Sequence, residues 1–295
     1  MTPRIPFTKG NGAGNDFLVL HDPGNQLALT PAVISQLCDR RTGIGADGIL
    51  RAVLCGRSPE ARRYAGQATW FMDYRNADGS LGGMCGNGIR VLTRHLTHHH
   101  HSPPGRLTLA TRAGLRSVSI TESGPSGEVT VHMGRPHLPL PSDALAVTAG
   151  QGSWPALYVD VGNPHAVVFV DDLDHPGSLT SPPTVVPLPP QGITVEFVRI
   201  LAPGHLALRV HERGVGETPA CGTGACAAAI AAHRAGIRPS DDTYRVDAPG
   251  GTLRVRIQPD GTCTLTGPTA LTVSGLLTLA TPDSEHAVAQ AGSED

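Results

Sequence analysis

The chain has 295 residues, a formal net charge of −2 at pH 7 and a sequence pI near 6.7. Hydrophobic residues make up 39% of it, enough for sizeable cores, and the near-neutral balance argues against binding to nucleic acid or to a membrane surface. Lys and Arg total 23, and Lys9 is the single lysine. A P-loop is therefore excluded, and a pyridoxal-phosphate enzyme would have only Lys9 for its Schiff base.

Membrane spans and export signals are not evident in the sequence. No apolar run reaches the roughly 18 residues that a transmembrane helix needs, and residues 1–20 lack the layout of a signal peptide. We therefore expect a soluble cytoplasmic protein.

The first predicted elements are two strands joined by a glycine loop, over residues 7–20. Thr30 as N-cap and Pro31 as first helical residue predict a helix to about Arg40. The glycines of residues 43–48 match G-x-G-x-x-G, but a helix precedes them and an apolar, strand-like run follows. We reject a dinucleotide-binding fingerprint, because that motif requires a strand before it and a helix after it.

The middle of the chain predicts a strand over residues 69–74, a turn over residues 76–79, and a helix after Cys85, with apolar residues at helical spacing. Residues 98–101 are four consecutive histidines, which we expect to form a solvated loop rather than a metal site. We assign this loop no function. Three alternating segments then indicate a β-meander, near residues 106–109, 114–120 and 128–133.

The second half repeats this plan. Strands are predicted near 156–161, 166–170, 194–201 and 206–212, with a Pro-rich linker over residues 181–190. An Ala-rich helix then runs from Cys221 to about Ala235 and is stopped by Gly236. Short strands and a polar, disordered tail from about Thr281 are expected to follow.

The same motif opens the central helix of each half, as Cys85-Gly86-Asn87-Gly88 and as Cys221-Gly222-Thr223-Gly224. This repetition suggests a duplication with pseudo-twofold symmetry, in which the two cysteines face one another across a cleft. A helix N-terminus favours a thiolate and also binds a carboxylate through its unpaired N–H groups. Such a pair suits removal of a proton from one face of a carbon and delivery to the other.

The alternative is that both cysteines are buried helix starters. A disulfide between them is compatible with the catalytic interpretation, as an oxidised, inactive form. No C-x-x-C motif is present, and we expect the other cysteines to pack as small hydrophobes; these are Cys38, Cys55, Cys226 and Cys263.

Several motifs together resemble the diaminopimelate epimerase family. They are residues 11–17, 42–48, 76–80, 84–90, Gly162-Asn163-Pro164-His165 and residues 212–225, and the resemblance runs from about Phe7 to Leu276. It implies a cofactor-independent amino-acid epimerase, without metal, that interconverts LL- and meso-diaminopimelate for lysine and peptidoglycan synthesis by two-base proton transfer.

The implied fold is α+β, with two pseudo-symmetric domains that each curl a mixed, mostly antiparallel sheet round a central helix. We place the domains at residues 1–133 and 134–268, with a final strand over about 269–280 that returns to the first domain and a tail over 281–295. The active site is expected in the cleft between the domains. A homodimer is also a family-level expectation.

The resemblance also implies residue roles. Cys85 and Cys221 are the acid/base pair, and His165 and Glu212 orient or tune them. The reacting carboxylate is held by the amides of Gly86, Asn87, Gly222 and Thr223. The distal end of the substrate is read by Asn15, Asn76, Asn163 and Arg213.

Four of these assignments have plainer alternatives. His165 and Asn76 could serve only in turns, Asn15 could only supply a left-handed loop conformation, and Glu212-Arg213 could be a solvated pair.

One position departs from the family pattern Gly-x-Asn-Val-x-Phe, because Thr194 occupies the place of the Asn that helps bind the distal end. A hydroxyl replaces an amide that offers both donors and an acceptor. Two alternatives therefore stay open: the same chemistry on a different amino acid, and a catalytically silent amino-acid-binding protein.

Overall fold

The computed structural model describes residues 4–139 and 145–278, which form mostly β structure with three α-helices. The helices are α1 (Pro31–Cys38), α2 (Gly86–His98) and α3 (Gly222–Arg234). The strands of the first half are β1 (Arg4–Gly12), β2 (Asn15–His21), β3 (Gly48–Leu54), β4 (Trp70–Asn76), β5 (Gly105–Thr111), β6 (Gly114–Ile120) and β7 (Ser126–Gly134).

The strands of the second half are β8 (Leu145–Ala149), β9 (Gly152–Asp160), β10 (Pro164–Phe169), β11 (Thr184–Val186), β12 (Thr194–Ala202), β13 (His205–Glu212), β14 (Gly216–Thr218), β15 (Thr243–Ala248), β16 (Gly251–Ile257) and β17 (Cys263–Thr278). The tail expected from Thr281, and the last two residues of the expected final strand, lie outside the described residues.

The strands of the first lobe close into a ring around α2. Pairing runs from β1 through β2, β3, β4, β5, β6 and β7 to β17, which pairs with β1 again. The β2–β3 and β4–β5 pairs are parallel and the others antiparallel. Residues 86–97 of α2 are all buried, so this helix is the core of the lobe rather than a cover on its surface.

The second lobe curls a sheet around α3 in the same manner. The order of pairing is β9, β10, β12, β13, β15, β16 and β17, with the β10–β12 and β13–β15 pairs parallel. Residues 222–232 of α3 are buried. Their small alanine side chains let the surrounding strands approach the helix axis closely.

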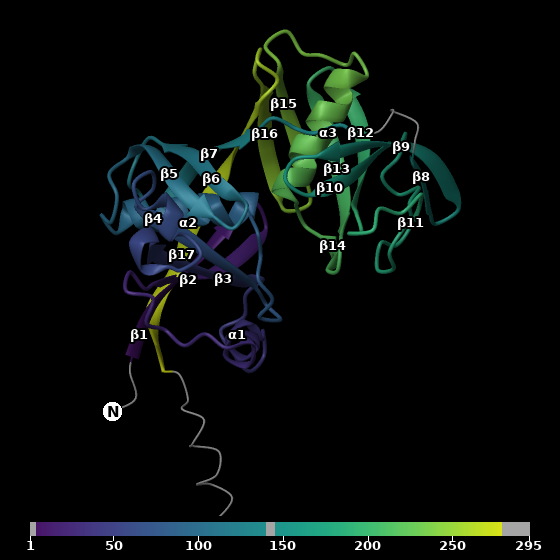
Figure 1. Cartoon of the computed structure of the whole chain (residues 1–295). Helices are drawn as coiled ribbons and strands as arrows, with labels where there is room; N and C mark the ends of the chain where they lie inside the picture. Colours follow the sequence, from purple (N-terminus) through teal and green to yellow (C-terminus); the bar gives the residue numbers. More distant parts are fainter. Residues whose placement is uncertain (1–3, 140–144, 279–295) are drawn as a thin grey trace, which may run out of the picture.

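One strand belongs to both lobes. β17 pairs with β16 through residues 263–266, with β7 through residues 263–270, and with β1 through residues 270–278. Figure 1 shows this yellow strand running from the lobe that holds α3 down through the lobe that holds α2. The two helices also contribute to a single hydrophobic core, which includes Leu92 of α2, Ala228 of α3 and Leu265 of β17.

Two predicted boundaries need correction. The first helix ends at Cys38 rather than Arg40, because the Asp39 carboxylate accepts the N–H groups of Arg41 and Thr42 and starts a turn there. Its expected start is confirmed, since the Thr30 hydroxyl caps Val33 N–H. The predicted linker over 181–190 contains β11, because its run of β-branched residues pairs with β8.

The G-x-G-x-x-G stretch is followed by strand β3 and not by a helix, which confirms that it is not a dinucleotide fingerprint. Among the helices of the described residues, none has both the length and the apolar character that crossing a bilayer requires.

A buried ion-pair hub fixes the first lobe. The Asp73 carboxylate on β4 is 1% exposed and accepts from Arg51 on β3 at 2.7 Å, from Arg112 at 2.5 Å and from Arg75 at 3.2 Å. Burial by itself raises the pKa of Asp73, but the hydrogen bond from Arg112 and the charge of Arg51 outweigh it, so the pKa is lowered overall.

We predict that Asp73→Asn lowers the free energy of unfolding by about 3–5 kcal/mol, because it leaves the three guanidinium groups without their shared carboxylate. The pKa of Asp73 is lower in the folded chain than in the unfolded one, so this stabilisation is present at neutral pH and is lost as the pH falls. Urea unfolding at pH 7 measures the first effect, and a pH series that continues well below 3.8, the ordinary pKa of an aspartate, measures the second, with exposed Asp171→Asn as the control. A loss below 1 kcal/mol at pH 7 would contradict the prediction.

Candidate active site

Cys85 and Cys221 have the same position and geometry in the two lobes. Each is the N-cap of its helix, in extended backbone conformation, and each thiol accepts the N–H three residues on, from Gly88 and from Gly224, at 3.3 Å. The repeated Cys-Gly motif therefore builds the same local structure twice. Cys85 is partly exposed and Cys221 is buried.

The two helix N-termini abut one another. A Cβ atom placed on Gly86 would lie 3.7 Å from Cα of Gly222, and one placed on Gly222 would lie 3.1 Å from Oδ1 of Asn87. Cδ2 of Leu265 on β17 would be 3.2 Å from the first of these Cβ positions and 3.0 Å from the second. Glycine at both positions allows the close approach, which brings both cysteine motifs to one place.

Asn87 connects the two motifs. Its Nδ2 donates to Oδ1 of Asn15 at 2.5 Å and to the carbonyl of Ala220, the residue before Cys221, at 3.5 Å. Asn15 in turn donates to Asp47 at 3.1 Å. The side chain of Asn87 is 1% exposed, so this chain of polar contacts fixes the first turn of α2 against the residue that precedes α3.

His165 on β10 forms a buried pair with Glu196 on β12. Nδ1 of His165 lies 2.6 Å from Oε1 of Glu196, and both side chains are fully buried. With Nδ1–H donating to the carboxylate, Nε2 carries the lone pair, and no partner for Nε2 is found within the described part of the chain. Oε1 of Glu196 also lies 2.6 Å from where a Cβ on Gly224 would sit, so this pair reaches the first turn of α3.

Glu212 ends β13 and accepts the hydroxyl of Thr218 on β14 at 2.5 Å. Burial raises the pKa of Glu212, an effect that this hydrogen bond partly offsets. The negative charge of Glu212 acts on both Cys85 and Cys221, and therefore lies close to both helix starts.

The surroundings of the two thiols oppose the effect of the helix N-termini on their pKa values. Burial raises the pKa of Cys85 to about 11, against the lowering effect of the Gly88 N–H. Burial and the charges of Glu212 and Glu196 raise the pKa of Cys221 still more clearly above its ordinary value. Desolvation of a charged sulfur therefore acts against the favourable helix N-terminus at both cysteines.

The residues expected to bind the distal end of the substrate differ in their position and in their contacts. Oγ1 of Thr194, buried at the start of β12, accepts the backbone N–H of Arg213 at 3.3 Å, and the guanidinium of Arg213 donates to the carbonyl of Gln191. Asn76 accepts from the hydroxyl of Tyr74 and donates to Ser80 at 2.9 Å, so it also organises its turn. Asn163 lies in the loop between β9 and β10, two residues before His165.

Two residues of the site were missed by sequence reasoning. Glu196 holds His165, and the signal was a lone carboxylate within the apolar run of residues 193–198. Tyr74 donates its hydroxyl to Asn76, and burial raises the pKa of Tyr74. A tyrosine in a strand gives no such signal in the sequence.

Lys9 is engaged elsewhere in the first lobe. Its ammonium group pairs with Asp16 at 2.9 Å and donates to the carbonyl of Gly45 at 2.7 Å.

We predict that Glu212→Gln accelerates alkylation of Cys85 by iodoacetamide at pH 8 by about three- to tenfold, since removal of the negative charge lowers the thiol pKa and enlarges the fraction of thiolate. Peptide mass spectrometry measures each cysteine separately. The matched control is Glu217→Gln on β14, the strand that pairs with the end of β13, where the Glu217 carboxylate pairs with Arg209. Unchanged or slower labelling of Cys85 in Glu212→Gln would show that this charge does not reach the thiol.

Comparison with known proteins agrees with the geometry of this site. A family model described as diaminopimelate epimerase matches residues 7–139 and 157–272. The diaminopimelate epimerase of Streptomyces coelicolor is 50% identical over 282 residues, which cover 93% of this chain and 96% of the relative. That of Acidothermus cellulolyticus is 40% identical and covers 94% of this chain and 97% of the relative.

Solved structures share the fold at low sequence identity. A hydroxyproline epimerase from Agrobacterium vitis superposes with a TM-score of 0.67 at 16% identity, covering 95% of this chain and 94% of the other. A probable proline racemase from Agrobacterium radiobacter gives 0.65 at 16% identity, with the same coverage. With the family model matching most of its length and relatives at 40–50% identity, the chain belongs to the diaminopimelate epimerase family.

Proposed function

We propose that this protein interconverts LL- and meso-diaminopimelate by inverting one α-carbon with Cys85 and Cys221 as the two acid/base groups. The observation that carries the proposal is the pair of N-cap cysteines on two abutting helix N-termini. Family membership and the 50% identical relative support this substrate.

The reaction begins when one cysteine, as thiolate, takes the α-proton. The C–H bond breaks, an S–H bond forms, and the electron pair stays on the α-carbon and its carboxylate. The second cysteine, as thiol, then gives its proton to the opposite face, so the configuration inverts and the two sulfurs exchange roles. The first N–H groups of α2 and α3 have no acceptor within their helices and suit the negative carboxylate; they belong to Gly86, Asn87, Gly222 and Thr223.

Burial raises the pKa of both thiols, so one of them has to release its proton to solvent before it can take the α-proton. We infer that the α-ammonium group of the substrate supplies the compensating positive charge. It offsets the charge of Glu212 and so lowers the pKa of the neighbouring thiol. His165, held by Glu196, orients the groups around α3, while Glu212 tunes both thiols; neither is required to exchange a proton with the α-carbon.

Recognition of the distal amino-acid group is assigned to Asn15, Asn76, Asn163, Thr194 and Arg213. Thr194 accepts one hydrogen bond from Arg213 N–H and keeps its own hydroxyl proton to donate. It can therefore hold both the Arg213 backbone and one acceptor of the substrate, which is compatible with diaminopimelate.

The two lobes are proposed to act as two domains, residues 1–133 and 134–268, with the substrate bound in a cleft between them. The abutting helix starts support this placement. A homodimer and a cytoplasmic location stay predictions from the family resemblance.

Purified protein is expected to incorporate solvent deuterium at the α-carbon of diaminopimelate without added pyridoxal phosphate. Cys85→Ala and Cys221→Ala should each lower kcat for epimerisation by at least about 100-fold, because each removes one acid/base group. Proton NMR in D2O follows the exchange, and Cys38→Ala, a buried cysteine outside the site, is the control. Full activity in either of the first two variants would exclude the two-cysteine mechanism.

A substrate panel tests the assignment of diaminopimelate. We expect kcat/KM for LL-diaminopimelate to exceed that for proline, hydroxyproline and other L-amino acids by at least about 100-fold, because polar groups built for the distal end are left unpaired by the smaller substrates. Stereochemical inversion is measured by chiral chromatography. If diaminopimelate is inert and a simpler amino acid turns over, Thr194 marks a relative with another substrate; if nothing turns over, the silent binding protein is the better description.

A further inference from the structure

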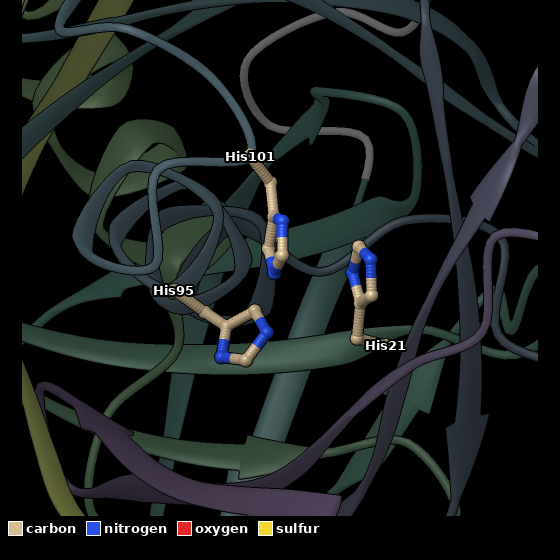
Figure 2. A group of neighbouring side chains, drawn as sticks. All are labelled: His21, His95 and His101. Carbon is tan, nitrogen blue, oxygen red and sulfur yellow. The ribbon is translucent and has the colours of Figure 1, made fainter.

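A cluster of histidines lies at the end of α2 opposite Cys85. His21 is the last residue of β2, His95 is on α2, and His101 follows the helix. One ring nitrogen of each lies within 4.8 Å of the other two, and Figure 2 shows the three rings converging on a common space. The rings of His21 and His101 stack with centroids 3.7 Å apart and planes 8° apart.

The ring nitrogens of this cluster lack protein partners. His95 is 5% exposed, and neither of its ring nitrogens has a hydrogen-bond partner within the described residues. Nδ1 of His21 is also buried without one. Buried polar atoms are normally paired, so an unpaired group that faces two further imidazoles indicates a missing ligand that accepts their lone pairs.

The surroundings favour a metal ion over an anion. Imidazole nitrogens directed into one space are typical ligands of a metal ion, and the neutral imidazole is the commonest of these ligands. The nearby Asp22 carboxylate is occupied by Arg51 at 3.2 Å and by the N–H groups of Gln26 and Leu27, so the available donors are imidazole nitrogens. Nitrogen-only sites select Zn²⁺, Ni²⁺, Co²⁺ or Cu²⁺ over Mg²⁺ and Ca²⁺.

We propose that His21, His95 and His101 form a binding site for a first-row transition-metal dication such as Zn²⁺, with a fourth position open to water. Tetrahedral zinc with bonds of about 2.0–2.1 Å places ligand nitrogens roughly 3.3 Å apart, so the ring nitrogens need to approach one another by at most about 1.5 Å. The stacked ring of His101 also has to turn away from that of His21, because imidazole lone pairs lie in the ring plane. The exposed side chain of His101 can make this movement and gives the ion a path from solvent.

The metal would link β2, through His21, to α2, through His95, and to the segment after α2, through His101. His95 is ten residues along the helix from Cys85, a rise of about 15 Å, so the ion is remote from the thiols and takes no part in proton transfer. The expected effect of the metal is to stabilise α2, the helix that begins directly after Cys85. The histidine run 98–101, expected to be a solvated loop, instead contributes His98 to α2 and His101 to this cluster.

The test uses the untagged full chain, stripped of metal with EDTA and dialysed. Calorimetric titration with Zn²⁺ is expected to give one ion per chain and none with Mg²⁺, and zinc is expected to raise Tm. His101→Asn alters an exposed side chain and should weaken zinc binding at least tenfold; His21→Asn should do the same. The matched control is His100→Asn, in the same loop, where Asn tolerates the left-handed backbone at φ 59°.

Two spectroscopic readouts locate the ion. Ni²⁺ should quench the fluorescence of Trp70, whose ring centroid is 5.1 Å from that of His21, and Trp154→Phe removes the only other tryptophan. Co²⁺ should give ligand-field bands without a thiolate charge-transfer band, which distinguishes this cluster from Cys85 and Cys221. Substoichiometric binding, a thiolate band, or equal affinity in His100→Asn and His101→Asn would overturn the proposal.

Discussion

The close approach of two helix N-termini is the constraint on which the rest of this structure depends. Gly86 and Gly222 allow it, because a side chain at either position would press on the other helix or on Leu265. Two curled sheets surround the two helices, and β17 belongs to both, so the lobes cannot separate without breaking a shared strand. Asn87 adds a polar contact across the junction, to the residue before Cys221. The positions of both sulfurs therefore follow from one contact between backbones.

At the same contact, opposing effects act on the pKa of each thiol. N–H groups at each helix start favour a thiolate, while burial and the charge of Glu212 oppose it, and the opposing effects are larger in the free protein. In the proposed reaction, the ammonium group of an amino-acid substrate would bring a positive charge next to the proton to be removed, so that substrate binding would also favour the thiolate. On the strands and the turn around α2, Asp73 pairs with three arginines.

A residue's role was predictable from the sequence where it depends on neighbours in the chain. It was not predictable where it depends on a contact with a residue far away in the chain. The N-cap roles of Thr30, Cys85 and Cys221 were readable because a cap and its helix are adjacent in sequence. The link between Asn87 and Ala220, and the partnership of His165 with Glu196, join positions far apart in the chain, and periodicity says nothing about such pairs. The histidine run shows the same limit: residues 98–101 are conspicuous in the sequence, yet His21 and His95, which complete the cluster, are not.

The sequence by itself determined where each helix begins, the family to which the chain belongs, and the two cysteines proposed for the reaction, because these depend on short motifs. The tertiary structure decided the surroundings that act on the pKa values of the two thiols. Desolvation depends on everything packed around a sulfur, and here it outweighs the favourable helix N-terminus that the motif alone suggests. The tertiary structure also decided that the two cysteine motifs meet, since only the curled sheets and the shared strand β17 bring Gly86 against Gly222.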